Sequence, residues 1–317
     1  MSLPFVDEEA LRRLLPPREA CDALERAFAG PLPAVPQRSR MDVAGGELML
    51  MPAAGEPGVG VKLVTIAPDN PARSLPLIHA LYLLFDADSL APVAAIDGSA
   101  LTAIRTAAVS AVATRHLARA GSRRLALFGA GVQAGAHLES MRAVLPIEEV
   151  VVVSRGRDRA EELAAGARDQ GLQAEVGSPD AVSDADVVCT CTTSSEPVFD
   201  GSALAPGTHV NAVGAYRPDM REIDSGAVAE ARVVVETREA ALAEAGDLLI
   251  PMGEGIIDAS HIVADLAEVV RGAKVRRTEE EVTLFKSVGV AFEDLVLARA
   301  AADRFARPAG APARTAP

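Results

Sequence analysis

The stretch that decides the fold reads Arg124-Leu-Ala-Leu-Phe128-Gly129-Ala130-Gly131-Val132-Gln133-Ala134. Its mostly apolar first five residues predict a buried strand, and residues 135–145 are predicted to be helical. Between them, Gly129 would allow a tight turn and Gly131 would let the backbone approach a pyrophosphate, while the small Ala134 permits close helix packing. Strand, glycine turn and helix together predict a dinucleotide site, with a plain glycine turn as the alternative.

The residues after the predicted second strand, 150–153, bear on the form of the cofactor. An NAD site usually carries an acidic residue here, which binds the ribose 2′-hydroxyl. This chain has Ser154, Arg155 and Arg157 instead, which favours the 2′-phosphate of NADP. We therefore expect NADP(H) to be preferred, with NAD(H) as the second candidate. The alternative is a solvated basic turn before a helix capped by Asp158.

Short apolar runs continue to alternate with helical patterns beyond this point, which predicts a doubly wound parallel sheet. The predicted strands are residues 124–128, 150–153, 187–190, 209–213 and 233–236. The tail, residues 279–307, is predicted to be mostly helical. The pair Cys189 and Cys191 has the spacing of a metal pair but no further ligands at a recognised spacing, so we interpret both as small buried residues near the cofactor.

Residues 1–120 show a different succession of predicted helices and strands. Two short helices, divided by Pro16 and Pro17, are followed by a meandering sheet and then by an Ala-rich helix over residues 101–120 that stops at Gly121. The predicted strands of this sheet are residues 48–51, 59–66, 77–85 and 92–96. The fold class is therefore α/β: a Rossmann-type domain at residues 121–297, and an α+β domain built from residues 1–120 with residues 298–317.

Composition narrows the function classes. The 317 residues carry 44 acidic and 31 basic side chains, a net charge of −13, which gives no electrostatic footprint for nucleic acid or anionic membranes. No apolar run approaches the roughly 18 residues that span a bilayer. Residues 1–10 are acidic rather than basic, unlike a signal peptide. Three cysteines in a long chain indicate a reducing compartment, so we expect a cytoplasmic protein.

Three cations of the N-terminal third are candidate ligands for an anion. Lys62 interrupts an apolar strand, and Arg105 lies on a helix of small apolar residues; Arg38 is the third. Such charges need a partner, which would be either a substrate carboxylate or internal carboxylates such as Glu47 or Asp97. Spacing alone leaves both readings open. His79, within an apolar run, is more typical of a core histidine than of a catalytic one.

Together these motifs resemble the ornithine cyclodeaminase/mu-crystallin family over nearly the whole chain. The resemblance is carried by Arg38, residues 50–52, Lys62, residues 101–108, 129–133, 210–215, 218–222, 245–247 and 283–289. It implies a homodimer in which the α+β domain binds substrate and mediates dimerisation. It implies that Arg38, Lys62 and Arg105 bind the α-carboxylate of an amino or imino acid. It also implies that further residues border the cofactor: Thr106, Thr192, Thr193, Val213 and Ser287.

One departure from the family's pattern directs the expected activity. Cyclodeaminases carry an aspartate, the expected general base, where this chain has Tyr216. The contexts of His79 and of Arg217-Pro218-Asp219 look more like the ketimine-reductase branch. The resemblance therefore implies an NAD(P)H-dependent reductase that converts Δ1-pyrroline-2-carboxylate or Δ1-piperideine-2-carboxylate to L-proline or L-pipecolate. Lys62, His79 or water would supply the proton to the imine nitrogen.

Three alternatives remain at this point. Within the same fold they are an ornithine cyclodeaminase and an alanine-type amino-acid dehydrogenase. From another class, the chain could be a non-catalytic, crystallin-like protein that binds NADP and a small ligand, because the glycine turn and the cations are needed for binding alone.

Overall fold

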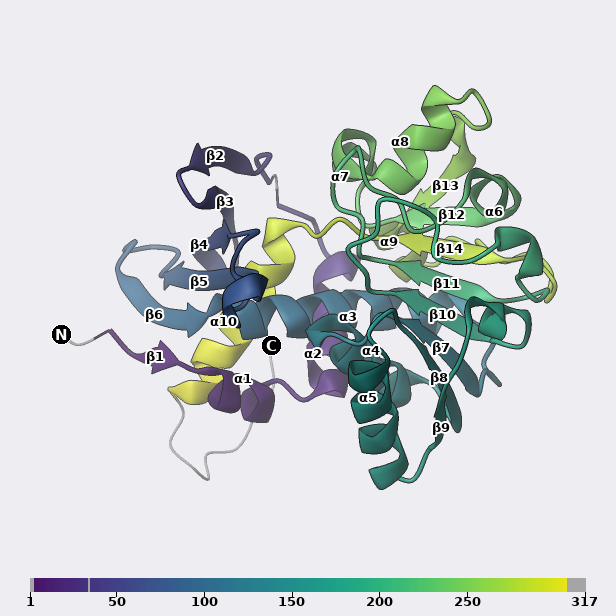
Figure 1. Ribbon diagram of the computed structural model, residues 1–317. Coiled ribbons are helices and arrows are strands. Elements are labelled where there is room, and N and C mark those ends of the chain that lie inside the picture. The colour runs from purple at the N-terminus through teal and green to yellow at the C-terminus, as the bar shows by residue number, and fades with distance from the viewer. Residues whose placement is uncertain (1–2, 34, 307–317) are drawn as a thin grey trace. The chain divides into compact units, whose positions relative to one another are not determined.

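The computed structural model describes residues 3–33 and 35–306, which form two compact units (Figure 1). The first unit comprises the described residues within Met1–Ala23, Leu32–Arg105 and Ala291–Pro317. The second comprises Leu24–Pro31 and Thr106–Val290. The predicted boundaries at residues 120 and 297 stay a prediction; the compact units change over at residues 105–106 and 290–291.

The first unit is a mostly antiparallel sheet with the order β1-β6-β5-β4-β3-β2, in which β1 and β6 alone are parallel among the described strands. The strands are β1 (Phe5–Val6), β2 (Ser39–Val43), β3 (Gly46–Gly55), β4 (Gly58–Ile66), β5 (Ile78–Phe85) and β6 (Pro92–Asp97). Helix α1 (Glu8–Leu14) and the short η1 (Pro71–Arg73) also belong to this unit. Helix α10 (Ala291–Phe305) packs against β3 and β4 and supplies much of the core.

The second unit is a parallel sheet with the order β13-β12-β14-β11-β10-β7-β8-β9. Its strands are β7 (Arg124–Phe128), β8 (Glu149–Val153), β9 (Gln173–Val176), β10 (Val187–Thr190), β11 (His209–Ala212), β12 (Arg232–Val235), β13 (Ile262–Asp265) and β14 (Thr283–Lys286). Because crossover helices cover a parallel sheet, β10 and β11 are buried along their whole length.

The helices of the second unit are mostly short. They are α4 (Val132–Val144), α5 (Arg157–Asp169), α6 (Ser225–Glu230), α7 (Arg238–Glu244), α8 (Gly246–Gly253) and α9 (Leu266–Val270), with the single turns η2 (Pro179–Ser183), η3 (Gly201–Ala203) and η4 (Ala259–His261). Helices α2 (Pro17–Ala29) and α3 (Gly98–Leu117) contribute residues to both units. Among the described residues, no helix is both long enough and apolar enough to cross a membrane.

The doubly wound parallel sheet and the separate α+β unit confirm the predicted fold class. The predicted helical tail is wrong at residues 283–286, which form β14 between β11 and β12. This strand is only four residues long, and its two neighbours in the sheet, rather than its own sequence, keep it extended. The predicted helix over 101–120 begins earlier, at Gly98, because the Asp97 carboxylate caps it by accepting hydrogen bonds from Ser99 N and Ala100 N at 2.9 Å.

Candidate functional site

The glycine turn after β7 has the geometry that its sequence predicts. Gly129 has φ = +106°, a conformation that side chains rarely adopt, and its amide donates to the Val153 carbonyl at 2.8 Å. A Cβ atom at this position would lie 2.6 Å from the Cys191 carbonyl oxygen. The turn therefore holds β7, β8 and the segment after β10 together, and no residue larger than glycine fits there.

The start of α4 is open where a phosphate would need access. Gly131 is the N-cap residue, and nothing lies within 4 Å of the position that a Cβ would take. The next residues follow the predicted pattern: Val132 is 69% exposed, while Ala134 is buried against the sheet. Ala130 and Gln133 are partly buried on either side of these residues. A helix N-terminus with free space in front of its amides fits a pyrophosphate group.

The turn after β8 carries the predicted basic residues. Ser154 is partly buried, and its Oγ accepts a hydrogen bond from Gly156 N at 3.4 Å. Arg155 and Arg157 are exposed, and within residues 3–33 and 35–306 neither guanidinium makes an ion pair. Gly156, not Asp158, is the N-cap of α5, so the alternative of an Asp158-capped helix is wrong. Two unpaired guanidinium groups at this turn fit a 2′-phosphate.

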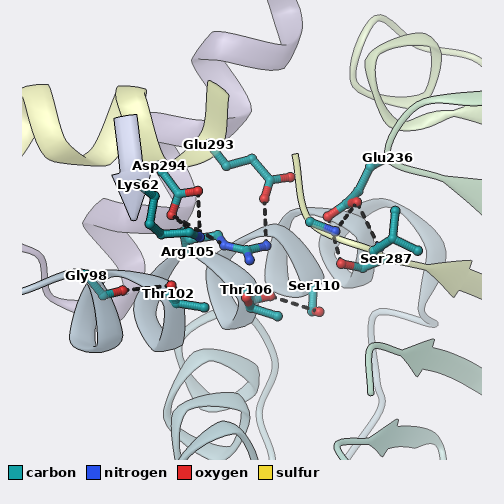
Figure 2. A network of polar contacts seen from close by, with 12 residues as sticks. Lys62, Gly98, Thr102, Arg105, Thr106, Ser110, Glu236, Ser287, Glu293 and Asp294 are labelled. Carbon is teal, nitrogen blue, oxygen red and sulfur yellow. Dashed lines mark hydrogen bonds and ion pairs between the residues drawn. The ribbon is translucent and has the colours of Figure 1, made fainter. Parts of the chain in front are cut away.

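The remaining residues that the family resemblance assigns to the cofactor lie mostly where strands of the second unit end. Thr192 and Thr193 follow β10, Val213 follows β11 and Ser287 follows β14. The Thr192 hydroxyl donates to Glu222 at 2.8 Å. Figure 2 shows the second contact, in which Ser287 Oγ donates to Glu236 at 2.7 Å. On α3, Thr106 Oγ1 is buried without a hydrogen-bond partner in the described part of the chain.

The two cysteines of the Cys189-x-Cys191 motif lie at the end of β10. Cys189 is fully buried, and this burial raises the pKa of its thiol to about 12. Cys191 follows β10 and donates its backbone N–H to the Phe128 carbonyl. Among the described residues, no group of three or more His, Cys, Asp or Glu side chains could hold a metal ion.

The first unit contains a buried cluster of opposite charges (Figure 2). Lys62 lies on β4 and is 1% exposed; its Nζ donates to both oxygens of the Asp294 carboxylate, at 2.9 and 2.8 Å. Arg105 on α3 donates through Nη1 to Glu293 at 3.2 Å, and its Nε lies 3.6 Å from Asp294. We call Lys62, Arg105, Glu293 and Asp294 the charge cluster.

The charge cluster shifts the pKa of Lys62. Burial lowers this pKa to about 8, even though the nearby Asp294 carboxylate acts to raise it. The positive charges of Arg105 and Arg38 lower it further. Arg38 is partly buried, and its Nη1 lies 3.9 Å from the sulfur of Met49. The three predicted cations are thus close enough to interact, and their presence beside two carboxylates suits the binding of one more anion.

Sequence reasoning missed the carboxylate partners of these cations. The suggested partners act elsewhere, since Glu47 pairs with Arg40 at 3.2 Å and Asp97 caps α3. Glu293 and Asp294 lie 188 and 232 positions away from Arg105 and Lys62. Two adjacent acids in the apolar first turn of a predicted helix were the available signal.

Two further predicted residues can be placed. His79 lies on β5 and is exposed, so its interpretation as a core histidine is wrong: alternation along β5 turns its side chain away from the core. Tyr216 is partly buried in the segment after β11.

The sequence that forms this fold and this site matches one known protein family. The family model for the ornithine cyclodeaminase/mu-crystallin family matches residues 8–308. The chain belongs to the ornithine cyclodeaminase/mu-crystallin family.

Several of the proteins to which this chain is similar are named as reductases. The chain is 39% identical over 263 residues to a Δ1-pyrroline-2-carboxylate reductase of Bacillus cereus, covering 79% of each protein. It is 40% identical over 292 residues to the ketimine reductase mu-crystallin of Rattus norvegicus, covering 90% of each. A solved structure, the Thermococcus litoralis Δ1-pyrroline-2-carboxylate reductase with NADH and L-proline, matches with a TM-score of 0.90 and 36% identity, covering 95% of this chain and 97% of that one.

Proposed function

We propose that this protein is an NAD(P)H-dependent reductase of cyclic imino acids, which converts Δ1-pyrroline-2-carboxylate or Δ1-piperideine-2-carboxylate to the saturated amino acid. The observation that carries the proposal is the buried charge cluster, with Lys62, Arg105 and the neighbouring Arg38, in a chain that also holds a dinucleotide turn. The relatives named above support the same substrate class.

In this proposal the chain's cations bind the substrate through its carboxylate. Charge-assisted hydrogen bonds from Lys62, Arg105 and Arg38 fix the orientation of the ring, and a fixed orientation lowers the entropic cost of reaching the reactive geometry. Glu293 and Asp294 hold Lys62 and Arg105 in place before substrate arrives. Because these four charged side chains are already removed from water, the site needs little reorganisation when the substrate binds.

The cofactor fits the residues of the second unit. Gly131 and the first turn of α4 would bind the pyrophosphate, and Ser154, Arg155 and Arg157 would bind a 2′-phosphate. When bound, the nicotinamide cofactor supplies the hydride that reduces the C=N bond. We infer a preference for NADPH over NADH from the two unpaired guanidinium groups.

Lys62 is the favoured holder of the proton that the imine nitrogen needs. Its pKa of about 8 keeps a proton on Nζ at neutral pH while leaving that proton easier to give up than in an ordinary lysine. His79, the other candidate side chain, is exposed on β5.

We also infer a homodimer, as the family resemblance implies.

The test is an initial-rate comparison of four substrates with NADPH or NADP⁺: pyrroline-2-carboxylate, piperideine-2-carboxylate, pyruvate with ammonia, and ornithine. We expect oxidation of NADPH with one or both cyclic imino acids. Tyr216 offers no negative charge to a second ammonium group, so release of ammonia from ornithine should be negligible. Robust conversion of ornithine to proline would contradict the proposal, and so would cofactor binding without any turnover.

A further inference from the structure

A buried carboxylate lies beneath the ends of β10 and β11. The Glu222 side chain is fully buried and accepts four hydrogen bonds. Two come from the hydroxyls of Thr190 and Thr192, both at 2.8 Å. The other two come from the backbone amides of Thr192 and Gly214, both at 2.7 Å. This single side chain thus joins the segments that follow two neighbouring strands.

All four groups around Glu222 are donors, so both of its oxygens act as acceptors. The two amides belong to residues beyond the strand ends, where the sheet no longer supplies a backbone acceptor, and a buried amide without an acceptor is costly. Gly214 has no space for a side chain, because a Cβ there would overlap the Thr192 carbonyl oxygen. The carboxylate and the glycine together fix the separation of the two segments.

A second layer of polar contacts holds Glu222 itself. Asp247 accepts hydrogen bonds from the backbone amides of Glu222 and Ile223, at 2.6 and 2.9 Å. Its other oxygen pairs with Lys286 on β14 at 2.8 Å, and Lys286 donates to the Ala212 carbonyl of β11 at 3.1 Å. This network connects the ends of β10, β11 and β14, all of which lie on one side of β7 in the sheet.

Holding Glu222 in this place is unfavourable for the carboxylate itself. Burial and the nearby Asp247 raise its pKa above the ordinary value, and Lys286 opposes that shift. Packing alone would be served as well by an apolar side chain. Buried ionisable groups of this kind gather at functional sites.

The place of Glu222 in the sheet indicates which part of the cofactor it serves. In a doubly wound sheet, the two halves on either side of the first strand bind the two halves of a dinucleotide. The basic turn with Arg155 lies on the β8 side of β7, whereas Glu222 lies on the β10 side. We propose that Glu222 is a positioning residue for the nicotinamide half of the cofactor, acting through Thr192 and Gly214; this rests on the proposed function.

The test is the variant Glu222→Gln with two probes whose binding is measured without substrate. NADPH contacts both halves of the site, whereas adenosine 2′,5′-bisphosphate carries the adenosine and 2′-phosphate but no nicotinamide. The amide group of glutamine would face a donor, Thr192 N or Gly214 N, and would displace at least one segment. We expect affinity for NADPH to fall by about 10-fold or more, and affinity for the bisphosphate to stay within about 2-fold.

The matched control is Glu196→Gln, the same change at an exposed position of the segment after β10, which should leave both affinities unchanged. Thr190→Val removes one donor and keeps the side-chain shape, so it decides the matter if Glu222→Gln does not fold; it should weaken NADPH selectively, by a smaller factor. Unchanged NADPH affinity in the folded variants, or equal losses for both probes, would overturn the inference. A wild-type protein that binds neither probe would instead contradict the proposed function.

Discussion

Lys62 carries its charge at a position where burial opposes it. Transfer from water disfavours the ammonium form, and the bidentate contact with Asp294 only partly restores it, which leaves a pKa of about 8. A residue with this pKa changes charge within the range in which the enzyme can be assayed. Its protonation state is therefore open to measurement by kinetics.

We expect kcat/KM for the cyclic imino acid to fall as the pH rises through about 8, because Lys62 then loses the proton that attracts the carboxylate. Lys62→Arg keeps its charge at higher pH, so the fall should move to more alkaline values, although the maximal rate is lower. The measurement is a pH profile of kcat/KM for both proteins. An alkaline fall at the same pH in both would assign it to another group.

Arg155 is the residue on which the proposed preference for NADPH depends most directly. Its guanidinium is exposed and makes no ion pair with the described residues, so it is available to a 2′-phosphate. Wild-type protein should bind NADPH about 10- to 150-fold more tightly than NADH, from a charge-assisted contact of about 1.5–3 kcal/mol. Arg155→Asp should erase or reverse that preference.

The control for this change is Arg159→Asp. Arg159 lies four positions after Arg155 and is also exposed, on α5. It alters the net charge equally but should keep most of the preference for NADPH. Dissociation constants for both cofactors, measured by fluorescence titration, check the prediction. Equal constants for the two cofactors in wild-type protein would refute it.

At the scale of the element, α10 supplies the anions of the charge cluster. Asp294→Asn should destabilise the protein by about 3–5 kcal/mol, because it leaves the buried Lys62 without its counter-ion. Asp303→Asn on the same helix removes an exposed partner of Arg299 and should cost about 0.5 kcal/mol or less. Denaturant unfolding of the three proteins gives the comparison. Similar midpoints for both variants would mean that the buried pair adds no stability.

Elements with local signals were predictable from the sequence, and those held by distant partners were not. The β7–turn–α4 unit is specified within eleven residues, so Gly129, Gly131 and Ala134 have the predicted places. The sequence predicts helix at β14, and the prediction is wrong because the extended form of this strand depends on β11 and β12, which flank it.

The residues of the candidate site fall into the same two groups, those with a local sequence signal and those that depend on distant partners. Lys62 and Arg105 stood out because each interrupts an apolar segment. Their partners on α10 did not, since no spacing rule connects residues 232 positions apart. Glu222 belongs to the family motif at residues 218–222, but its four donors come together only when β10 and β11 lie side by side.

At the scale of the whole molecule, the first unit has exposed apolar side chains on its sheet. Met41 and Val43 on β2 and Ile78 on β5 are 53%, 44% and 41% exposed. Met41 and Val43 point to the same face of β2, which lies at the edge of the sheet, and such exposed apolar side chains are typical of a surface that another chain covers. A second copy of this chain is the partner that we infer.

We expect a mass in solution of about twice 32.8 kDa by light scattering. Val43→Lys should shift the equilibrium towards single chains, because it puts a charge on that surface. Leu242→Lys, at a similarly exposed apolar position on α7, should have no such effect. A wild-type protein with the mass of one chain would contradict the homodimer.

The position of β14 also has a consequence for translation. The strand fills the place between β11 and β12, yet it follows β13 in the chain. Because a ribosome adds residues from the N-terminus at about 5–20 per second, the nascent sheet keeps an open gap with two unpaired edges until residues 283–286 emerge. Lys62 and Arg105 also lack their carboxylate partners during this time, because Glu293 and Asp294 are synthesised only shortly after β14. A chain released before this point would lack the strand that joins β11 to β12 and the carboxylates that pair with Lys62 and Arg105. We therefore expect premature termination to give a protease-sensitive species rather than a shorter enzyme.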